Sequence, residues 1–166
     1  MKNLMLFVHP SKDFLPEQKT AIKIEIDNDL SLGWKAEDII LATNFPYEYN
    51  GVKSLIVRDD NYDIDISPCA GIINVIVELF ERNMIKKDEL YWYHDIDLYQ
   101  IYRITEAELN LGKADIGLVV MGTRQKFSAS SMFFKAGAKD IYALTKEIMY
   151  KYRVNEELAL NPIATN

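Results

Sequence analysis

Short apolar runs alternate along the chain with longer segments in which apolar residues recur at helical spacing. The first run covers residues 4–8 and stops before Pro10, and the next segment opens at Pro16. A continuous apolar run of this length is typical of a strand buried on both faces. Because proline suits the first turn of a helix and glycine the position after its end, we predict a helix over residues 16–32 that stops at Gly33.

The same alternation continues along the rest of the chain. Ser67-Pro68 is a strong helix start, and Ile73, Ile76 and Phe80 follow on one helical face. Further strands are predicted at residues 38–43, 53–58, 90–97, 114–121 and 131–135, and further helices at residues 67–80 and 138–152. Strands that alternate with helices favour an α/β fold with a mostly parallel sheet flanked by helices. The length suits a single domain over residues 1–166.

Composition and charge narrow the range of partners. Hydrophobic residues make up 49% and charged residues 27% of the chain, a globular balance that argues against extensive disorder. The formal net charge is −6 at pH 7, so the chain lacks a general positive field, and we expect no nucleic-acid partner. Any bound phosphate must be held locally, by a helix N-terminus, a few basic side chains or a metal ion.

The single cysteine and the N-terminus bear on the compartment. Cys69 cannot form an internal disulfide, which fits a reducing environment, and we expect it to be a small buried residue near a helix start. The apolar run at residues 4–8 is too short for a signal peptide or a membrane span. We therefore expect a cytoplasmic protein without a membrane span.

The candidate chemistry lies in the aromatic segment that ends in Asp95-Ile96-Asp97. Ligands bind at the carboxyl edge of strands in α/β sheets. Side chains alternate along a strand, so Asp95 and Asp97 share one face while His94 points to the other. Two acids at the end of an apolar strand repel each other, and a divalent cation removes that repulsion. We predict an Mn²⁺ or Mg²⁺ site at Asp95 and Asp97; the alternative is that these acids only end a strand and start a turn.

A second Asp-Ile-Asp, at residues 63–65, offers the same tripeptide in a different setting. It continues an acidic run that begins at Asp59 like a calcium-binding loop. The positions that need glycine and glutamate hold Ile64 and Ala70, which excludes an EF-hand. We predict that residues 63–65 form a solvated loop leading to the helix start at Ser67.

Several other site types lack their signatures. No Cys/His cluster suits zinc, and no serine lies in a Gly-x-Ser-x-Gly elbow. Glycine spacing supports neither a dinucleotide fingerprint nor a Walker loop. Hydride transfer and ordinary nucleoside-triphosphate hydrolysis are therefore poorly supported.

Three segments resemble, in order, the GT-A fold of nucleotide-sugar-dependent glycosyltransferases. The first is the alternating α/β half from Leu4 to about Phe80, and the second is Tyr91-Trp92-Tyr93-His94-Asp95-Ile96-Asp97, which is similar to the family's Asp-x-Asp motif. The third is Ala114-Asp115-Ile116-Gly117 leading to residues 127–134, similar to the segment that lines the sugar and acceptor pocket. The resemblance implies a Rossmann-like GT-A architecture, with a nucleotide-binding half over residues 1–90 and a metal and acceptor half over residues 91–166.

The resemblance also implies roles for individual residues. Asp97 would bind Mn²⁺ or Mg²⁺ and bridge to the donor diphosphate, and Asp95 would share the metal or hold the ribose. Residues at the other strand ends would contact the nucleotide, namely His9, Pro10, Ser11, Thr43, Asn44 and Arg58. A surface salt bridge is an equal alternative for Arg58. In inverting members Glu156 or Glu157 would deprotonate the acceptor hydroxyl, although an ordinary helix start capped by Asn155 explains the same residues.

The chain also departs from the family pattern. Many members add a histidine ligand after the sixth strand, whereas no histidine follows His94, and the chain is short for the family. We expect a short or truncated member whose acceptor-binding part is minimal or comes from a partner chain, and a homo-oligomer is compatible with this.

The leading hypothesis is a metal-dependent glycosyltransferase that moves a sugar from a nucleotide-diphosphate sugar to an unknown glycan, protein or lipid acceptor. A non-catalytic GT-A-like binding or assembly module is the alternative from another class. A metal-dependent phosphoester hydrolase that uses Asp95, Asp97 and an acid of residues 63–65 is less favoured, because two-metal hydrolases usually need more ligands.

Overall fold

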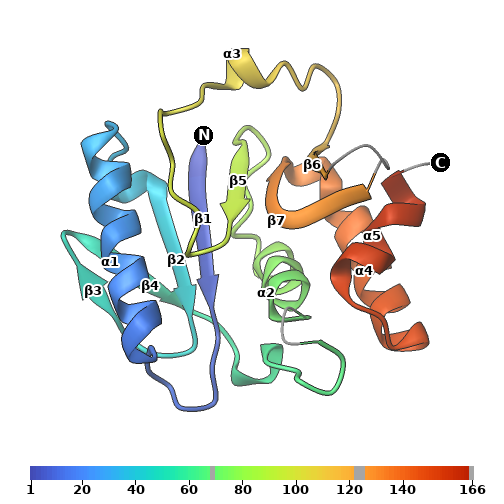
Figure 1. Ribbon diagram of the computed structural model, residues 1–166. Helices are drawn as coiled ribbons and strands as arrows, with labels where there is room; N and C mark the ends of the chain where they lie inside the picture. The colour runs from blue at the N-terminus through green and yellow to red at the C-terminus, as the bar shows by residue number, and fades with distance from the viewer. Residues whose placement is uncertain (68–69, 122–125, 165–166) are drawn as a thin grey trace.

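The computed structural model describes residues 1–67, 70–121 and 126–164, without the side chains of Met121 and Lys126. The predicted helix start at Pro68 and the predicted buried Cys69 lie outside these ranges. Seven strands form one sheet in the order β3-β4-β2-β1-β5-β7-β6 (Figure 1). The strands are β1 (Lys2–Phe7), β2 (Ile39–Thr43), β3 (Glu48–Tyr49), β4 (Val52–Ile56), β5 (Tyr91–His94), β6 (Ile116–Met121) and β7 (Lys126–Phe134).

Five of the seven strands run in one direction. β4, β2, β1 and β5 pair in parallel, and β6 shares their direction because it and β5 both pair antiparallel with β7. β3 and β7 run the opposite way. The predicted α/β fold with a mostly parallel sheet is confirmed.

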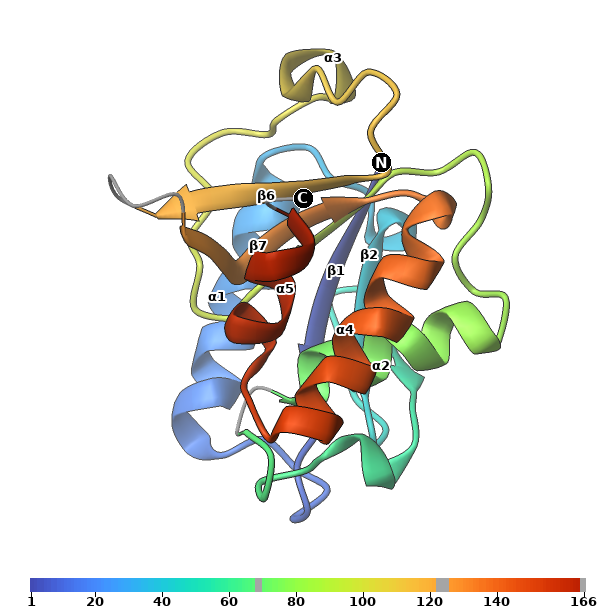
Figure 2. The same ribbon diagram turned by 90° about the vertical axis from the view of Figure 1, so that its right-hand side faces the viewer.

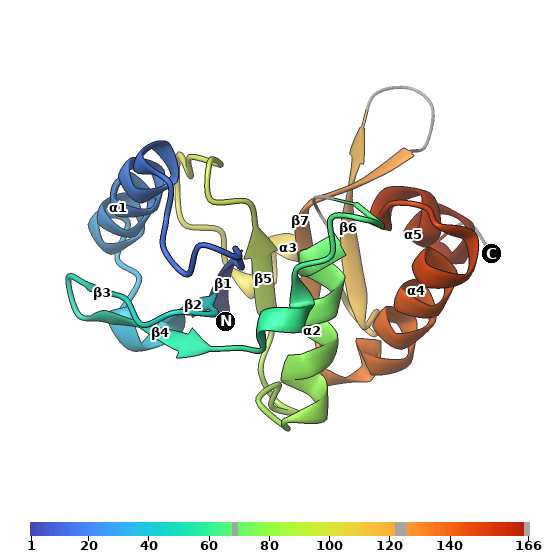
Figure 3. The same cartoon turned by 90° about the horizontal axis from the view of Figure 1, so that it is seen from below.

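Helices cover both faces of this sheet. α1 (Pro16–Ser31) lies on one face, and α2 (Ala70–Glu81), α4 (Lys139–Tyr152) and α5 (Glu156–Ala164) lie on the other (Figures 2 and 3). The short α3 (Glu106–Leu109) belongs to the connection between β5 and β6. None of the helices in the described ranges is long and apolar enough to cross a membrane.

Each face of the sheet has its own apolar core, as alternation along the strands requires. Ile22 and Ile26 of α1 pack with Met5 and Trp92 on one face. Leu4, Tyr91 and Tyr93 pack on the other face against apolar side chains of α2, α4 and α5. Neighbouring residues of β5 therefore face different helices, and this separates His94 from Asp95 in the site described below.

Most predicted boundaries agree with the structure to within a few residues, but β5 is shorter than predicted. It ends at His94, because the Asp95 carbonyl accepts a hydrogen bond from Leu98 N at 3.2 Å and closes a turn. Asp95 and Asp97 thus lie in a turn after the strand, as the alternative interpretation of these acids proposed. β7 begins earlier than the predicted residues 131–135, since its polar first half also pairs with β6.

Candidate functional site

Three adjoining cavities follow the edge of the sheet where the parallel strands have their carboxyl ends. The largest, of about 430 Å³, lies beside the turn that follows β5. It shares Leu6, Phe7 and Ile72 with a cavity of about 210 Å³, which in turn shares Tyr62 with a third of about 340 Å³. We call the three together the edge groove. It is lined by Leu6, Phe7, Val8, His9, Pro10, Lys12, Glu17, Gln18, Ala21, Asn44, Asp59, Tyr62, Gly71, Ile72, Tyr93, Asp95, Ile96 and Asp97.

Asp95 and Asp97 both line the largest cavity. Burial raises the pKa of Asp95 above its usual range, and the charges of Asp97 and Glu157 raise it further. The Tyr93 hydroxyl opposes this shift by donating a hydrogen bond of 2.5 Å to Asp95 Oδ1. Negative charge at Asp95 is therefore poorly compensated by the protein, which is the setting in which a cation stabilises a carboxylate pair.

The first turn of α5 carries the two other predicted acids. Asn155 Oδ1 accepts a hydrogen bond from Leu158 N at 2.9 Å, so the predicted helix start is confirmed. Burial raises the pKa of Glu156, and the nearby charges of Glu157 and Asp95 add to the effect. The fold therefore brings the acids of α5 within electrostatic range of the turn after β5, although neither of them lines the edge groove.

The far end of the edge groove holds three of the predicted nucleotide contacts: His9, Pro10 and Asn44. The His9 ring stacks on Phe7 with 6.0 Å between ring centroids and meets Tyr62 edge-on at 5.7 Å. Asn44 holds this loop in place, because its Oδ1 accepts from His9 N at 3.1 Å and its Nδ2 donates to His9 O at 3.0 Å. Tyr62 was not predicted, since nothing in its acidic loop marks it as a groove residue.

The other three predicted nucleotide contacts do not line the edge groove. Thr43 is buried and its hydroxyl donates to the carbonyl of Phe45. Ser11 donates to the carbonyl of Asp13 at 3.0 Å. Arg58 pairs with Glu78 at 3.4 Å and Glu81 at 3.0 Å, which is the salt-bridge alternative of the sequence analysis.

The lining of the edge groove fits a divalent cation together with phosphate. Among its described residues Lys12 is the only lysine or arginine, and its ammonium group is 2.7 Å from Asp59. Asp95 and Asp97 offer the oxygen ligands that Mg²⁺ and Mn²⁺ prefer. Gly71 and Ile72, in the first turn of α2, also line the groove, so the positive end of that helix lies beside it.

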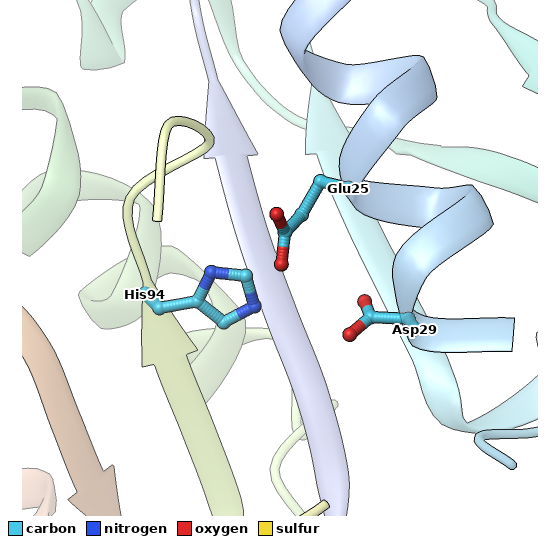
Figure 4. Close-up of side chains that lie close together, drawn as sticks. All are labelled: Glu25, Asp29 and His94. Atoms are coloured by element: carbon cyan, nitrogen blue, oxygen red, sulfur yellow. The ribbon is translucent and has the colours of Figure 1, made fainter. Parts of the chain in front are cut away.

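His94 points away from Asp95 and Asp97, as predicted, but it faces two unexpected acids. The side chains of Glu25 and Asp29, both on α1, point toward the His94 ring (Figure 4). Burial lowers the pKa of His94 to about 4, so its ring is neutral at pH 7. Burial also raises the pKa of Glu25 to about 8 and that of Asp29 to about 7. Their four-residue spacing on one helix face was a signal in the sequence, but exposed acids show the same spacing.

Comparison with known proteins identifies no family. No protein-family model and no curated protein sequence matches the chain. Among solved structures, the fold is similar to the crystal structure of mouse xyloside xylosyltransferase 1 in its apo form, with 15% identity and a TM-score of 0.49. The similarity covers 97% of this chain and 78% of that one.

Proposed function

We propose that the protein is a metal-dependent glycosyltransferase that transfers a sugar from a nucleotide-diphosphate sugar to an acceptor. One observation carries the proposal: Asp95 and Asp97 line a cavity of about 430 Å³ at the carboxyl edge of the parallel strands. This is where α/β sheets bind ligands, and a paired carboxylate there favours a diphosphate shared with a divalent ion.

The shape of the edge groove supports a nucleotide lying along it. In this proposal the base lies near the aromatic rings of His9 and Tyr62, which line the two smaller cavities. The diphosphate lies at the other end, against Asp95 and Asp97. An ion bound there supplies the positive charge that stabilises the leaving nucleotide diphosphate. The sugar then reaches the part of the cavity beside α1, where Glu17 and Gln18 offer polar contacts.

The test uses ligand-induced thermal stabilisation with a panel of nucleoside diphosphates and their sugars, with and without Mn²⁺ or Mg²⁺. One diphosphate series should raise Tm by about 5–10 °C at 100 times its dissociation constant, and only when the metal is present. A matched series of nucleoside monophosphates should give smaller shifts, because they lack the bridging phosphate. If no nucleotide shifts Tm, the proposal fails; binding without release of nucleotide diphosphate identifies a binding module instead.

Glu157 is the second residue to test, because its charge raises the pKa of Asp95. If Glu157 is the base that deprotonates the acceptor, Glu157→Gln should lower turnover by about 10²–10⁴-fold and leave nucleotide affinity unchanged. Glu156→Gln is the matched comparison, since Glu156 is buried and accepts a hydrogen bond from Ser67 at 3.4 Å. Equal turnover in Glu157→Gln and the wild type would leave Glu157 a structural role, in the helix start and in the hydrogen bond of 3.4 Å that its Oε1 accepts from Ala129 N.

A further inference from the structure

Three ionisable side chains converge on the face of the sheet opposite Asp95. Glu25 and Asp29 come from α1 and His94 comes from β5, and none of them is more than 2% exposed. One ligand atom from each lies within 4.8 Å of the other two. Figure 4 shows the two carboxylates and the imidazole pointing toward the same space beside β1.

The two carboxylates are incompletely satisfied. Glu25 Oε1 and Asp29 Oδ1 are buried and have no hydrogen-bond partner in the described part of the chain. The other oxygen of Asp29 accepts a hydrogen bond of 2.7 Å from Asn3 Nδ2. No salt bridge reaches either carboxylate within the described ranges. Two neighbouring buried acids are costly to ionise without a counter-charge, and a bound cation would stabilise their ionised forms.

The hydrogen bonds of His94 indicate which of its ring nitrogens could bind a cation. Nδ1 lies 2.9 Å from the carbonyl oxygen of Asp95, and we assign the proton to Nδ1, which then donates to that carbonyl. With the proton on Nδ1, Nε2 keeps its lone pair for an ion. Nε2 lies 2.8 Å from Asn3 Oδ1, which is also an acceptor because the amide nitrogen of Asn3 is turned to Asp29. With this assignment Nε2 and Asn3 Oδ1 are two acceptors opposite each other. A cation bound between or beside them would make this contact favourable.

We propose that Glu25, Asp29 and His94 form a structural site for a divalent transition-metal ion, with Zn²⁺ the best match. Two carboxylates balance the double charge, and a neutral imidazole with carboxylate oxygens is a donor set that suits zinc better than magnesium. Asn3 Oδ1 is placed to complete four ligands. The bond from His94 Nδ1 to a backbone carbonyl is the kind of second contact that fixes a metal-bound histidine.

This site is independent of the proposed sugar transfer. Asp95 and Asp97 face the edge groove, whereas the ion between Glu25, Asp29 and His94 lies under α1 and joins that helix to the end of β5. The buried ion therefore acts on the fold, and its loss leaves the carboxylates of the edge groove in place.

The test begins with full-length protein, expressed without a metal-binding tag, treated with a chelator and titrated with Zn²⁺ or Co²⁺ in the absence of nucleotide. We expect one ion per chain, a visible absorption band for Co²⁺ and a rise in Tm of about 5–10 °C at 100 times the dissociation constant. Mg²⁺ at the same concentration should not reproduce this shift.

Variants separate this site from the edge groove. Asp29→Asn should lose the ion and its Tm shift, while Asp27→Asn, an exposed substitution on the same helix, and Asp97→Asn should keep both. Asp29→Asn removes a poorly compensated buried charge, so the metal-free variant should fold and remain measurable. The proposal is overturned if no ion binds, if Asp29→Asn binds it as tightly as the wild type, or if Asp97→Asn loses it. The last result would place the ion in the edge groove.

Discussion

Replacing Asp97 with asparagine is expected to reduce sugar transfer by about 10³-fold and to abolish the metal-dependent part of nucleotide binding. Several kcal/mol of stabilisation of the leaving diphosphate are lost with the ion, and each 1.36 kcal/mol is about a factor of ten in rate. Release of nucleotide diphosphate and calorimetric titration, each with and without Mn²⁺, would measure both effects.

The chain provides a matched control for this substitution. Residues 63–65 repeat the tripeptide Asp-Ile-Asp, but they lie in a turn outside the edge groove. Asp65 is exposed, so Asp65→Asn should change neither turnover nor nucleotide affinity. If the two variants lose activity equally, or if Asp97→Asn remains fully active with Mn²⁺, the assignment of the metal site to Asp95 and Asp97 is wrong.

The largest loss of stability is expected for Phe134→Ala. Phe134 is fully buried on β7, and its ring lies 5.6 Å from Tyr91, 5.1 Å from Tyr142 and 6.0 Å from Phe80, measured between ring centroids. Removing the ring leaves a cavity between the sheet and its helices and breaks three aromatic contacts. The free energy of unfolding should fall by about 4 kcal/mol, which urea titration would measure.

The adjacent residue is the control for that experiment. Phe133 points to the opposite face, is partly exposed, and stacks on Trp92 with 5.8 Å between centroids. Phe133→Ala should therefore cost clearly less than Phe134→Ala. Equal losses would contradict the assignment of the main core to the face covered by α2, α4 and α5.

Hydrophobic periodicity was sufficient to predict most of the fold. The helix predicted over residues 16–32 is α1, Pro16–Ser31, and it ends before Gly33, whose φ of +88° is easily adopted only by glycine. The end of β5 was harder to predict. Asp95 N donates to Ser130 O at 3.0 Å while the Asp95 carbonyl closes a turn, and a contact with a distant strand cannot be read from the local pattern.

The same difference between local and distant contacts decides which residues of the candidate site could be predicted. The Asp-Ile-Asp after β5 could be found because its residues are neighbours in the sequence. Tyr62, Glu25 and Asp29 could not be found in this way, because the residues that they contact come from segments far away in the sequence. Arg58 does not line the edge groove, because in the fold it pairs with Glu78 and Glu81 of α2. The role of the predicted residues in binding a nucleotide stays a prediction.

The order of strands at one side of the sheet has a consequence for how the protein is made. β6 precedes β7 in the chain, yet β7 lies between β5 and β6 and provides the pairing for both. β6 is therefore synthesised before the strand with which it pairs, and one edge of β5 stays unpaired until β7 has joined the sheet. Exposed strand edges promote association between chains. Released chains that end after β6 and lack β7 should accordingly be the ones most dependent on chaperones.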